Sequence, residues 1–150
     1  MPFDAPIRLG PFTVDAVGRL APRDPAQAAG FTVRFRGRLV QVGLPPAGRA
    51  LSVRAVLGRV PSTAGEGAAR RATALALLAR PDAALPPDWR LHLLADHRLA
   101  LEASLELALP AGVATLVGTV ALLLLELAPY LDELEEAGLD AAGIVNTWPG

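Results

Sequence analysis

Apolar and polar positions alternate through residues 31–60, and this pattern predicts an antiparallel meander of three strands. The first strand has one apolar and one basic face, with Phe31, Val33 and Phe35 set against Thr32, Arg34 and Arg36. The apolar phase then shifts to Val40, Val42 and Leu44, which predicts a tight turn at Arg36-Gly37, because glycine accepts the positive φ of such turns. Pro45–Gly48 predicts the next turn, and one face of a third strand carries Leu51, Val53, Ala55 and Leu57.

A second alternating stretch runs from Trp89 to Leu107 and predicts two more strands. Its longer half alternates the apolar positions Leu99, Leu101, Ala103, Leu105 and Leu107 with polar or small ones. Trp89, Leu91 and Leu93 mark the partner strand, and Ala95-Asp96-His97 supplies the turn between them. This is the pattern of a half-buried strand pair.

The first thirty residues predict strand and loop. The phrase Phe-Thr-Val…Gly-Arg-Leu occurs at 12–20 and again at 31–39, so it indicates two similar hairpins. Two copies are too few to define a repeat architecture. Prolines and glycines between Pro22 and Gly30 predict a loop.

Two stretches predict helices. Thr63 and Glu66 have the spacing of a capping box, an alanine-rich interior follows from Ala68 to Ala79, and Pro81 closes the segment. Small side chains allow close approach, so this helix could pack on the sheet or against a copy of itself. The second helix is predicted to begin near Ala111, to kink at Pro129, and to end in the acidic segment 132–136.

The second helix belongs to an apolar run, Leu107–Ala128, which has no charge between Glu106 and Glu126. From Ala111 to Leu125 a helix is about 22 Å long, short of a hydrocarbon core of about 30 Å. Its flanks are acidic, so we predict no membrane span. Two alternatives remain open: a helix buried in its own core, or one whose second face is shared with a partner chain.

The predicted fold class is therefore α+β, with helices packed on one face of an antiparallel sheet. The predicted order is a β-rich N-terminus, then β-β-β-α-β-β-α. We divide the chain into a strand and loop segment at 1–30, an α+β domain at 31–137 and a mobile tail at 138–150.

Composition sets further bounds. With 52% hydrophobic and 19% charged residues, the 150-residue chain fits one folded domain and leans towards oligomerisation. It has no cysteine, which excludes disulfides, and its start lacks a signal-peptide pattern, so we expect a cytoplasmic protein. Residues 1–80 hold twelve arginines and four acids, whereas residues 81–150 hold two arginines and eleven acids. Attraction between these halves within the fold is the preferred interpretation.

The sequence offers little catalytic chemistry. It has no lysine, hence no Walker-type phosphate loop, and no Gly-x-Ser-x-Gly elbow. His92 and His97, a strand residue and a turn residue, lack further ligands on one face, so we predict no metal, no cofactor and no enzyme. The acids at 132–136 are expected to form a solvated face. The meander carries Arg34, Arg36, Arg38 and Arg54, but Phe31 and Phe35 point opposite to Arg34 and Arg36, which argues against a nucleic-acid platform.

The order of elements resembles the class I type III secretion chaperones, the Tir-chaperone family. The resemblance rests on Phe31–Leu44, on Ala50–Pro61 with its Leu57-Gly58-Arg59-Val60-Pro61 ending, and on the strand pair followed by a long final helix. It covers residues 30–137. The family begins with an amphipathic helix that contributes to client binding, whereas residues 1–30 here are predicted to be strand and loop.

The resemblance implies a small homodimer without enzymatic activity that holds the N-terminal region of a secreted effector in an extended form. A structural or adaptor domain of the same fold, without an export role, is the alternative. Client contacts would fall on Phe31, Val33, Phe35, Val40, Val42, Leu51 and Val53. In the family the second helix and its neighbouring strands commonly form the dimer contact, which here implies Ala72, Leu75, Leu78, Trp89, Leu91 and Leu93.

Overall fold

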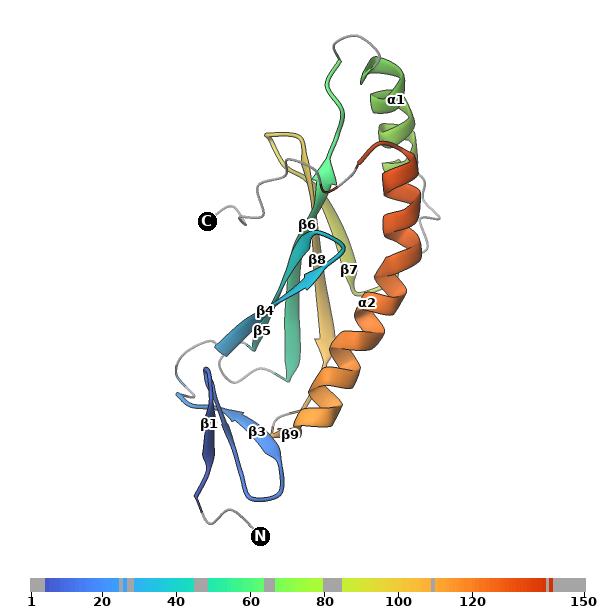
Figure 1. Cartoon of the computed structure of the whole chain (residues 1–150). Coiled ribbons are helices and arrows are strands. Elements are labelled where there is room, and N and C mark those ends of the chain that lie inside the picture. Colours follow the sequence, from blue (N-terminus) through green and yellow to red (C-terminus); the bar gives the residue numbers. More distant parts are fainter. Residues whose placement is uncertain are drawn as a thin grey trace.

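The computed structural model describes residues 5–24, 26, 29–44, 49–63, 67–79, 85–108, 110–139 and 141. These residues form an α+β structure with two antiparallel sheets and two helices (Figure 1). In chain order the elements are β1 (Ile7–Leu9), β2 (Phe12–Val14), β3 (Arg19–Pro22), β4 (Ala29–Phe35), β5 (Arg38–Leu44), β6 (Ala50–Arg59), α1 (Gly67–Leu78), β7 (Trp89–Leu93), β8 (Arg98–Glu106), β9 (Ala111–Gly112) and α2 (Val113–Glu136).

The larger sheet has the strand order β4-β5-β6-β8-β7, and α2 runs along one of its faces (Figure 1). The helix turns a single stripe of buried residues toward the sheet: Leu116, Val120, Leu123, Leu127, Leu131 and Leu134. Their spacing of three and four residues keeps them on one side of an α-helix. Alternate residues of β5, β6 and β8 fill the space beneath this stripe and form the core.

Both predicted strand groups are confirmed. The turn between β4 and β5 is formed by Arg36 (φ 49°) and Gly37 (φ 78°), the two positive values of a type I′ turn. The β7–β8 pair is joined by a turn in which His97 has a φ of 67°. The two Phe-Thr-Val phrases do form similar hairpins, β2–β3 and β4–β5, each with a glycine of positive φ before the Arg-Leu pair.

The N-terminal segment is not separate from the rest of the chain. It forms a smaller sheet, β1-β2-β3-β9, whose last strand comes from just before α2. Leu20 of β3 pairs with Ala111 of β9, and Phe12 and Leu20 are buried in the main core. The predicted boundary at residue 30 therefore divides a continuous structure. The predicted order lacked β9, because a two-residue strand is too short to show alternation.

Helix α1 buries few of its residues, although its alanine-rich sequence would allow close packing on the sheet. Ala74 is its one fully buried residue, and Ala68, Ala69, Ala72 and Ala76 are exposed. Figure 1 shows α1 at the end of the sheet, beside the C-terminal turn of α2. The predicted cap residue Glu66 and the closing Pro81 lie outside the described residues.

The domain extends beyond the predicted boundary at residue 137. Gly138 has a φ of 92°, and its amide donates to the Glu135 carbonyl, while the Leu139 amide donates to the Leu134 carbonyl at 2.8 Å. This is a Schellman end to α2. Leu139 is 0% exposed, so residues 138 and 139 belong to the packed domain and not to a tail. Residues 142–150 lie outside the described residues.

Candidate protein-binding surface

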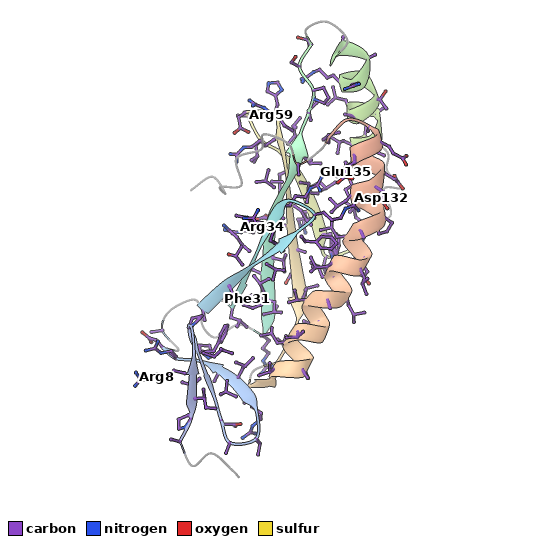
Figure 2. All side chains as sticks on the ribbon, in the orientation of Figure 1. Arg8, Phe31, Arg34, Arg59, Asp132 and Glu135 are labelled. Carbon is purple, nitrogen blue, oxygen red and sulfur yellow. The ribbon has the colours of Figure 1, made fainter. Side chains whose placement is uncertain are left out.

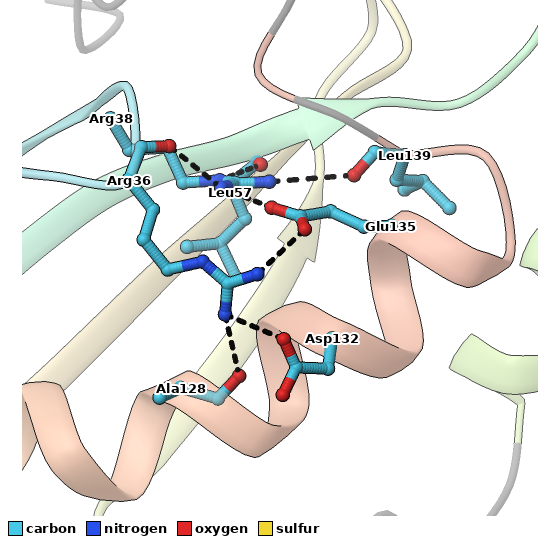
Figure 3. Close-up of polar contacts among 7 residues, drawn as sticks. All are labelled: Arg36, Arg38, Leu57, Ala128, Asp132, Glu135 and Leu139. Atoms are coloured by element: carbon cyan, nitrogen blue, oxygen red, sulfur yellow. Dashed lines mark hydrogen bonds and ion pairs between the residues drawn. The ribbon is translucent and has the colours of Figure 1, made fainter.

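Hydrogen bonds and ion pairs connect the turn between β4 and β5 to the C-terminal part of α2 (Figure 3). Arg38 is 1% exposed, and its Nη1 donates to Glu135 Oε1 at 2.8 Å and to the Arg36 carbonyl at 3.0 Å. Its Nε donates to the Leu57 carbonyl on β6. A buried guanidinium must have hydrogen-bond partners. Those of Arg38 lie in the β4–β5 turn, on β6 and on α2.

Arg36 also connects this turn to α2, at a more exposed position than Arg38. Its Nη1 lies 2.7 Å from Asp132 Oδ1 and its Nη2 lies 2.7 Å from Glu135 Oε2, while Nη1 also donates to the Ala128 carbonyl at 3.1 Å. The hydrogen bond to Asp132, with the nearby Glu135 charge, holds the pKa of Arg36 above its ordinary value. The basic and acidic halves thus attract within the fold, as expected. Asp132 and Glu135 pair with arginines, while Asp132, Glu133 and Glu136 remain exposed, which agrees with the expected solvated face.

An apolar groove of about 330 Å³ lies where the smaller sheet meets the start of α2. It has one wall from the β1–β2 hairpin and another from the first turns of α2, and is lined by Leu9, Gly10, Pro11, Phe12, Leu20, Phe31, Val113, Leu116 and Val117. The rings of Phe12 and Phe31 meet edge to face, with centroids 6.3 Å apart, which joins the hairpin to β4. The N-terminal segment therefore builds part of a potential binding site.

Phe31 leads from this groove onto β4, an edge strand of the larger sheet. In the described part of the chain β4 pairs with β5 alone. Phe35 and Arg38 flank the two-residue turn, so they form a hydrogen-bonded pair. Hydrogen-bonded pairs alternate with non-hydrogen-bonded pairs along an antiparallel ladder, so every second residue of β4 directs its N–H and C=O groups away from β5. These are Gly30, Thr32 and Arg34. The apolar side chains of this strand, Phe31, Val33 and Phe35, are half-buried and pack against the margin of the core.

The opposite face of the larger sheet is polar. Figure 2 shows Arg34 and Arg59 on the side of the sheet away from α2. At the centre of this face, Glu102 lies 3.2 Å from Arg54 Nε and 3.1 Å from His92 Nε2. His97 lines a different hollow, of about 460 Å³, where its Nδ1 lies 3.2 Å from Arg71 Nη1. Among the described residues, His, Cys, Asp and Glu form no group of three that could hold a metal.

The structure places the expected client-binding residues in two environments. Phe31, Val33 and Phe35 are half-buried on the edge strand and accessible from one side. Val40, Val42, Leu51 and Val53 are 0–2% exposed, because they form the core beneath α2. We therefore do not place client contacts on these four residues. Alternation identified their face of the sheet, but could not tell that their own helix covers it.

The expected dimer residues are similarly divided. Leu93 is 50% exposed, Leu75 is 37% exposed and Ala72 is exposed. Leu78 and Leu91 are half-buried, and Trp89 is 6% exposed, packed in the core. Trp89 is therefore covered by its own chain and offers little surface to a second copy.

The outward face of α2 is apolar and uncovered. Val117, Leu122 and Leu125 are 60%, 63% and 69% exposed. By length and composition α2 could cross a membrane: its most apolar 18-residue window has a mean hydropathy of 1.8, and 22% of that window is buried. Of the two alternatives left open by the sequence, a helix fully buried in its own core is therefore not what the single chain forms. The other alternative, a helix whose second face contacts a partner chain, stays a prediction. The absence of a membrane span stays a prediction.

Sequence reasoning missed the groove. Its residues come from four separate segments of the chain, and the one signal present was a phrase, Leu9-Gly10-Pro11-Phe12, typical of a tight turn with apolar flanks. Comparison of the chain with protein-family models, with curated proteins and with solved structures gave no match. Its function must therefore be argued from its own residues.

Proposed function

We propose that this protein is a non-enzymatic, homodimeric binding module that holds an extended segment of another protein, as the type III secretion chaperones that it resembles do. The proposal rests above all on one observation: the open edge of β4 continues directly into an apolar groove. Phe31 belongs to both. A structural or adaptor domain with the same binding surface, but no export role, is the alternative.

The edge of β4 supplies main-chain recognition. Gly30, Thr32 and Arg34 present peptide N–H and C=O groups that can pair with an added strand. Strand addition of this kind gives affinity that depends little on the sequence of the bound segment. The available edge ends where β4 ends, next to Arg36 and its ion pairs with α2.

The groove supplies side-chain recognition. Its lining is almost entirely apolar and wide enough for one or two aliphatic or aromatic side chains. A segment paired with β4 would direct alternate side chains to one side of the sheet, because successive residues of a strand point to opposite faces. The preferred client is therefore an extended segment with an apolar residue positioned to enter beside Phe31.

Selection from a library of displayed peptides tests the proposal, with the affinity of a selected peptide measured by fluorescence anisotropy. Thr32→Pro removes one outward N–H and no β5 hydrogen bond, so it should weaken peptide binding at least tenfold. Thr32→Ala keeps the amide and should bind as the wild type does. Leu9→Glu, within the groove, should also weaken binding, whereas Ile7→Glu, on the same strand but outside the groove lining, should not.

Two results would count against a client-binding module. One is a folded protein that selects no peptide from the library. The other is a selected peptide whose affinity is unchanged by both Thr32→Pro and Leu9→Glu. Capture of an effector from a strain with an export apparatus would separate the chaperone from the adaptor.

A further inference from the structure

The outward face of α2 carries a pattern that the fold of a single chain does not explain. Five exposed residues follow one another along this face without a charge: Ala114, Gly118, Ala121, Leu122 and Leu125. Three are small and two are large leucines. The buried stripe that contacts the sheet lies on the opposite side of the same helix.

Gly118 is the residue that most needs an explanation. Glycine is among the least favourable residues in the interior of a helix. A Cβ atom placed on Gly118 would meet nothing within 4 Å, so neither the sheet nor the smaller sheet requires glycine there. A close approach by something outside the single chain would require it, since glycine lets two backbones come together.

We infer that this face of α2 is the contact between two copies of the chain, with the two α2 helices antiparallel about a two-fold axis between Gly118 and Ala121. This deepens the proposed function, which calls for a homodimer, by naming the surface. The axis brings Gly118 of one copy level with the partner's Ala121. It sets Leu125 level with the partner's Ala114, and Leu122 beside the partner's Gly118. Each leucine thus meets a small residue, which makes the face self-complementary.

Charge complementarity also favours a second copy as the occupant. The first turn of α2 contains no acidic residue, and its N-cap, Gly112, offers no side-chain cap. A helix N-terminus carries a partial positive charge that a carboxylate stabilises. The same antiparallel register brings the exposed Glu126 level with Val113, the first residue of the partner's α2. The two-fold axis makes this contact twice.

A lipid surface fits the same face less well. The charged residues of α2 are all acidic: Glu126, Asp132, Glu133, Glu135 and Glu136. Helices that lie on membranes usually flank their apolar face with lysine or arginine, which anionic lipids attract. Here the acids would be repelled, and we therefore argue for protein.

Sedimentation equilibrium of the full chain over a concentration series tests this inference. The wild type should approach twice the 15.6 kDa mass of one chain. Leu125→Glu and Gly118→Leu should halve that mass at the same concentration. Far-UV circular dichroism and melting should remain those of a folded protein, since neither position has a contact that the single chain needs. Leu93→Glu and Leu75→Glu, on the surface implied by the family resemblance, are the matched controls and should stay dimeric.

Cross-linking tests the register, because the chain has no cysteine of its own. Ala121→Cys lies near the axis and should form a disulfide-linked dimer on oxidation. Ala114→Cys alone should not, but should cross-link when mixed with Leu125→Cys.

A monomer at every concentration would overturn the inference, and so would loss of the dimer in the two control variants alone. Flotation of the wild type with anionic vesicles, lost in Leu125→Glu, would overturn it in favour of lipid. Mass and peptide binding are measured separately, so failure here would not be confused with failure of the client-binding proposal.

Discussion

The guanidinium of Arg38 and the carboxylate of Glu135 lie 2.8 Å apart, although 97 residues separate them in the sequence. Arg38 is almost completely buried, whereas the Glu135 side chain is 33% exposed. The pair ties the tip of the β4–β5 hairpin to the last turns of α2. The buried stripe of α2 packs on the sheet through apolar side chains, whereas this pair and Arg36 form polar contacts that help to position the end of the helix.

Arg38→Met should lower the free energy of unfolding by about 3 kcal/mol. The substitution leaves the carbonyls of Arg36 and Leu57 without their donor and removes one of the two ion pairs of Glu135, which keeps its contact with Arg36. Urea denaturation measures the change. Arg34→Met is the matched control, because Arg34 is exposed on the same hairpin, and it should change stability by no more than about 0.5 kcal/mol. Equal effects of the two variants would show that the buried contact contributes little.

The hairpin between β2 and β3 should lose stability in acid. The Asp15 carboxylate accepts hydrogen bonds from the Arg19 amide at 2.9 Å and the Val17 amide at 3.0 Å, and pairs with Arg19 Nε at 2.7 Å. These bonds, led by the Arg19 amide, hold the pKa of Asp15 below its ordinary value of 3.8. A lowered pKa means that the stabilisation is present above 3.8 and is lost as the pH falls through the lower value of the folded state.

Asp15→Asn should therefore reduce the melting temperature at neutral pH, and the difference from the wild type should shrink in acid. Carbon-detected NMR titration gives the pKa directly, and Arg19→Gln should move it upward. An Asp15 that titrates at 3.8 or above would contradict this account.

Gly37→Ala should destabilise the protein by about 1–2 kcal/mol, because alanine is strained at positive φ. Gly37 has a φ of 78°, and an added Cβ would also lie 3.2 Å from the Cβ of Ala141. Gly18→Ala is the control in the related hairpin, where φ is 81° but nothing lies within 4 Å. The loss at Gly37 should exceed the loss at Gly18, both measured by thermal melting. A stabilising effect at either site would argue against the positive φ there.

The orientation of α2 can be tested with one leucine from each side. Leu131 is 0% exposed, so Leu131→Ala should cost about 2–5 kcal/mol through lost burial and the cavity left behind. Leu125 is 69% exposed, and Leu125→Ala should change the stability of the monomer by no more than about 0.5 kcal/mol. Both are measured by urea denaturation at a concentration that keeps the chain monomeric. A reversed order would mean that α2 faces the sheet with its other side.

Local patterns were sufficient for most of the secondary structure. The phase shift after Phe35 predicted a turn at Arg36-Gly37, because a side chain can change face only if the chain turns. The alternation from Leu99 to Leu107 predicted β8, because successive side chains of a strand point to opposite faces. These signals lie between residues close in sequence, where the period of two alone decides which side chains are buried. Two-residue β9 and the Schellman end at Gly138 were missed, since such short elements leave no period to detect.

The candidate site was less predictable. Val40, Val42, Leu51 and Val53 were correctly assigned to one face of the sheet, and what covers that face was not visible in their pattern. Phe31 was expected to contact a client and does line the groove, but its neighbours there come from β1, β2, β3 and α2. No spacing rule relates residues so far apart in the sequence.

By itself the sequence determined the strands of the larger sheet, the two helices and the apolar excess of α2, because each follows from the period with which apolar residues recur along the chain. Only the tertiary structure decided which half of that apolar surface is covered. The sheet buries the side of α2 that carries Leu131 and leaves the side with Leu125 open, since one sheet can pack against only one side of a helix. It also placed Arg38 beside Glu135, a contact created by folding between segments that no local pattern connects.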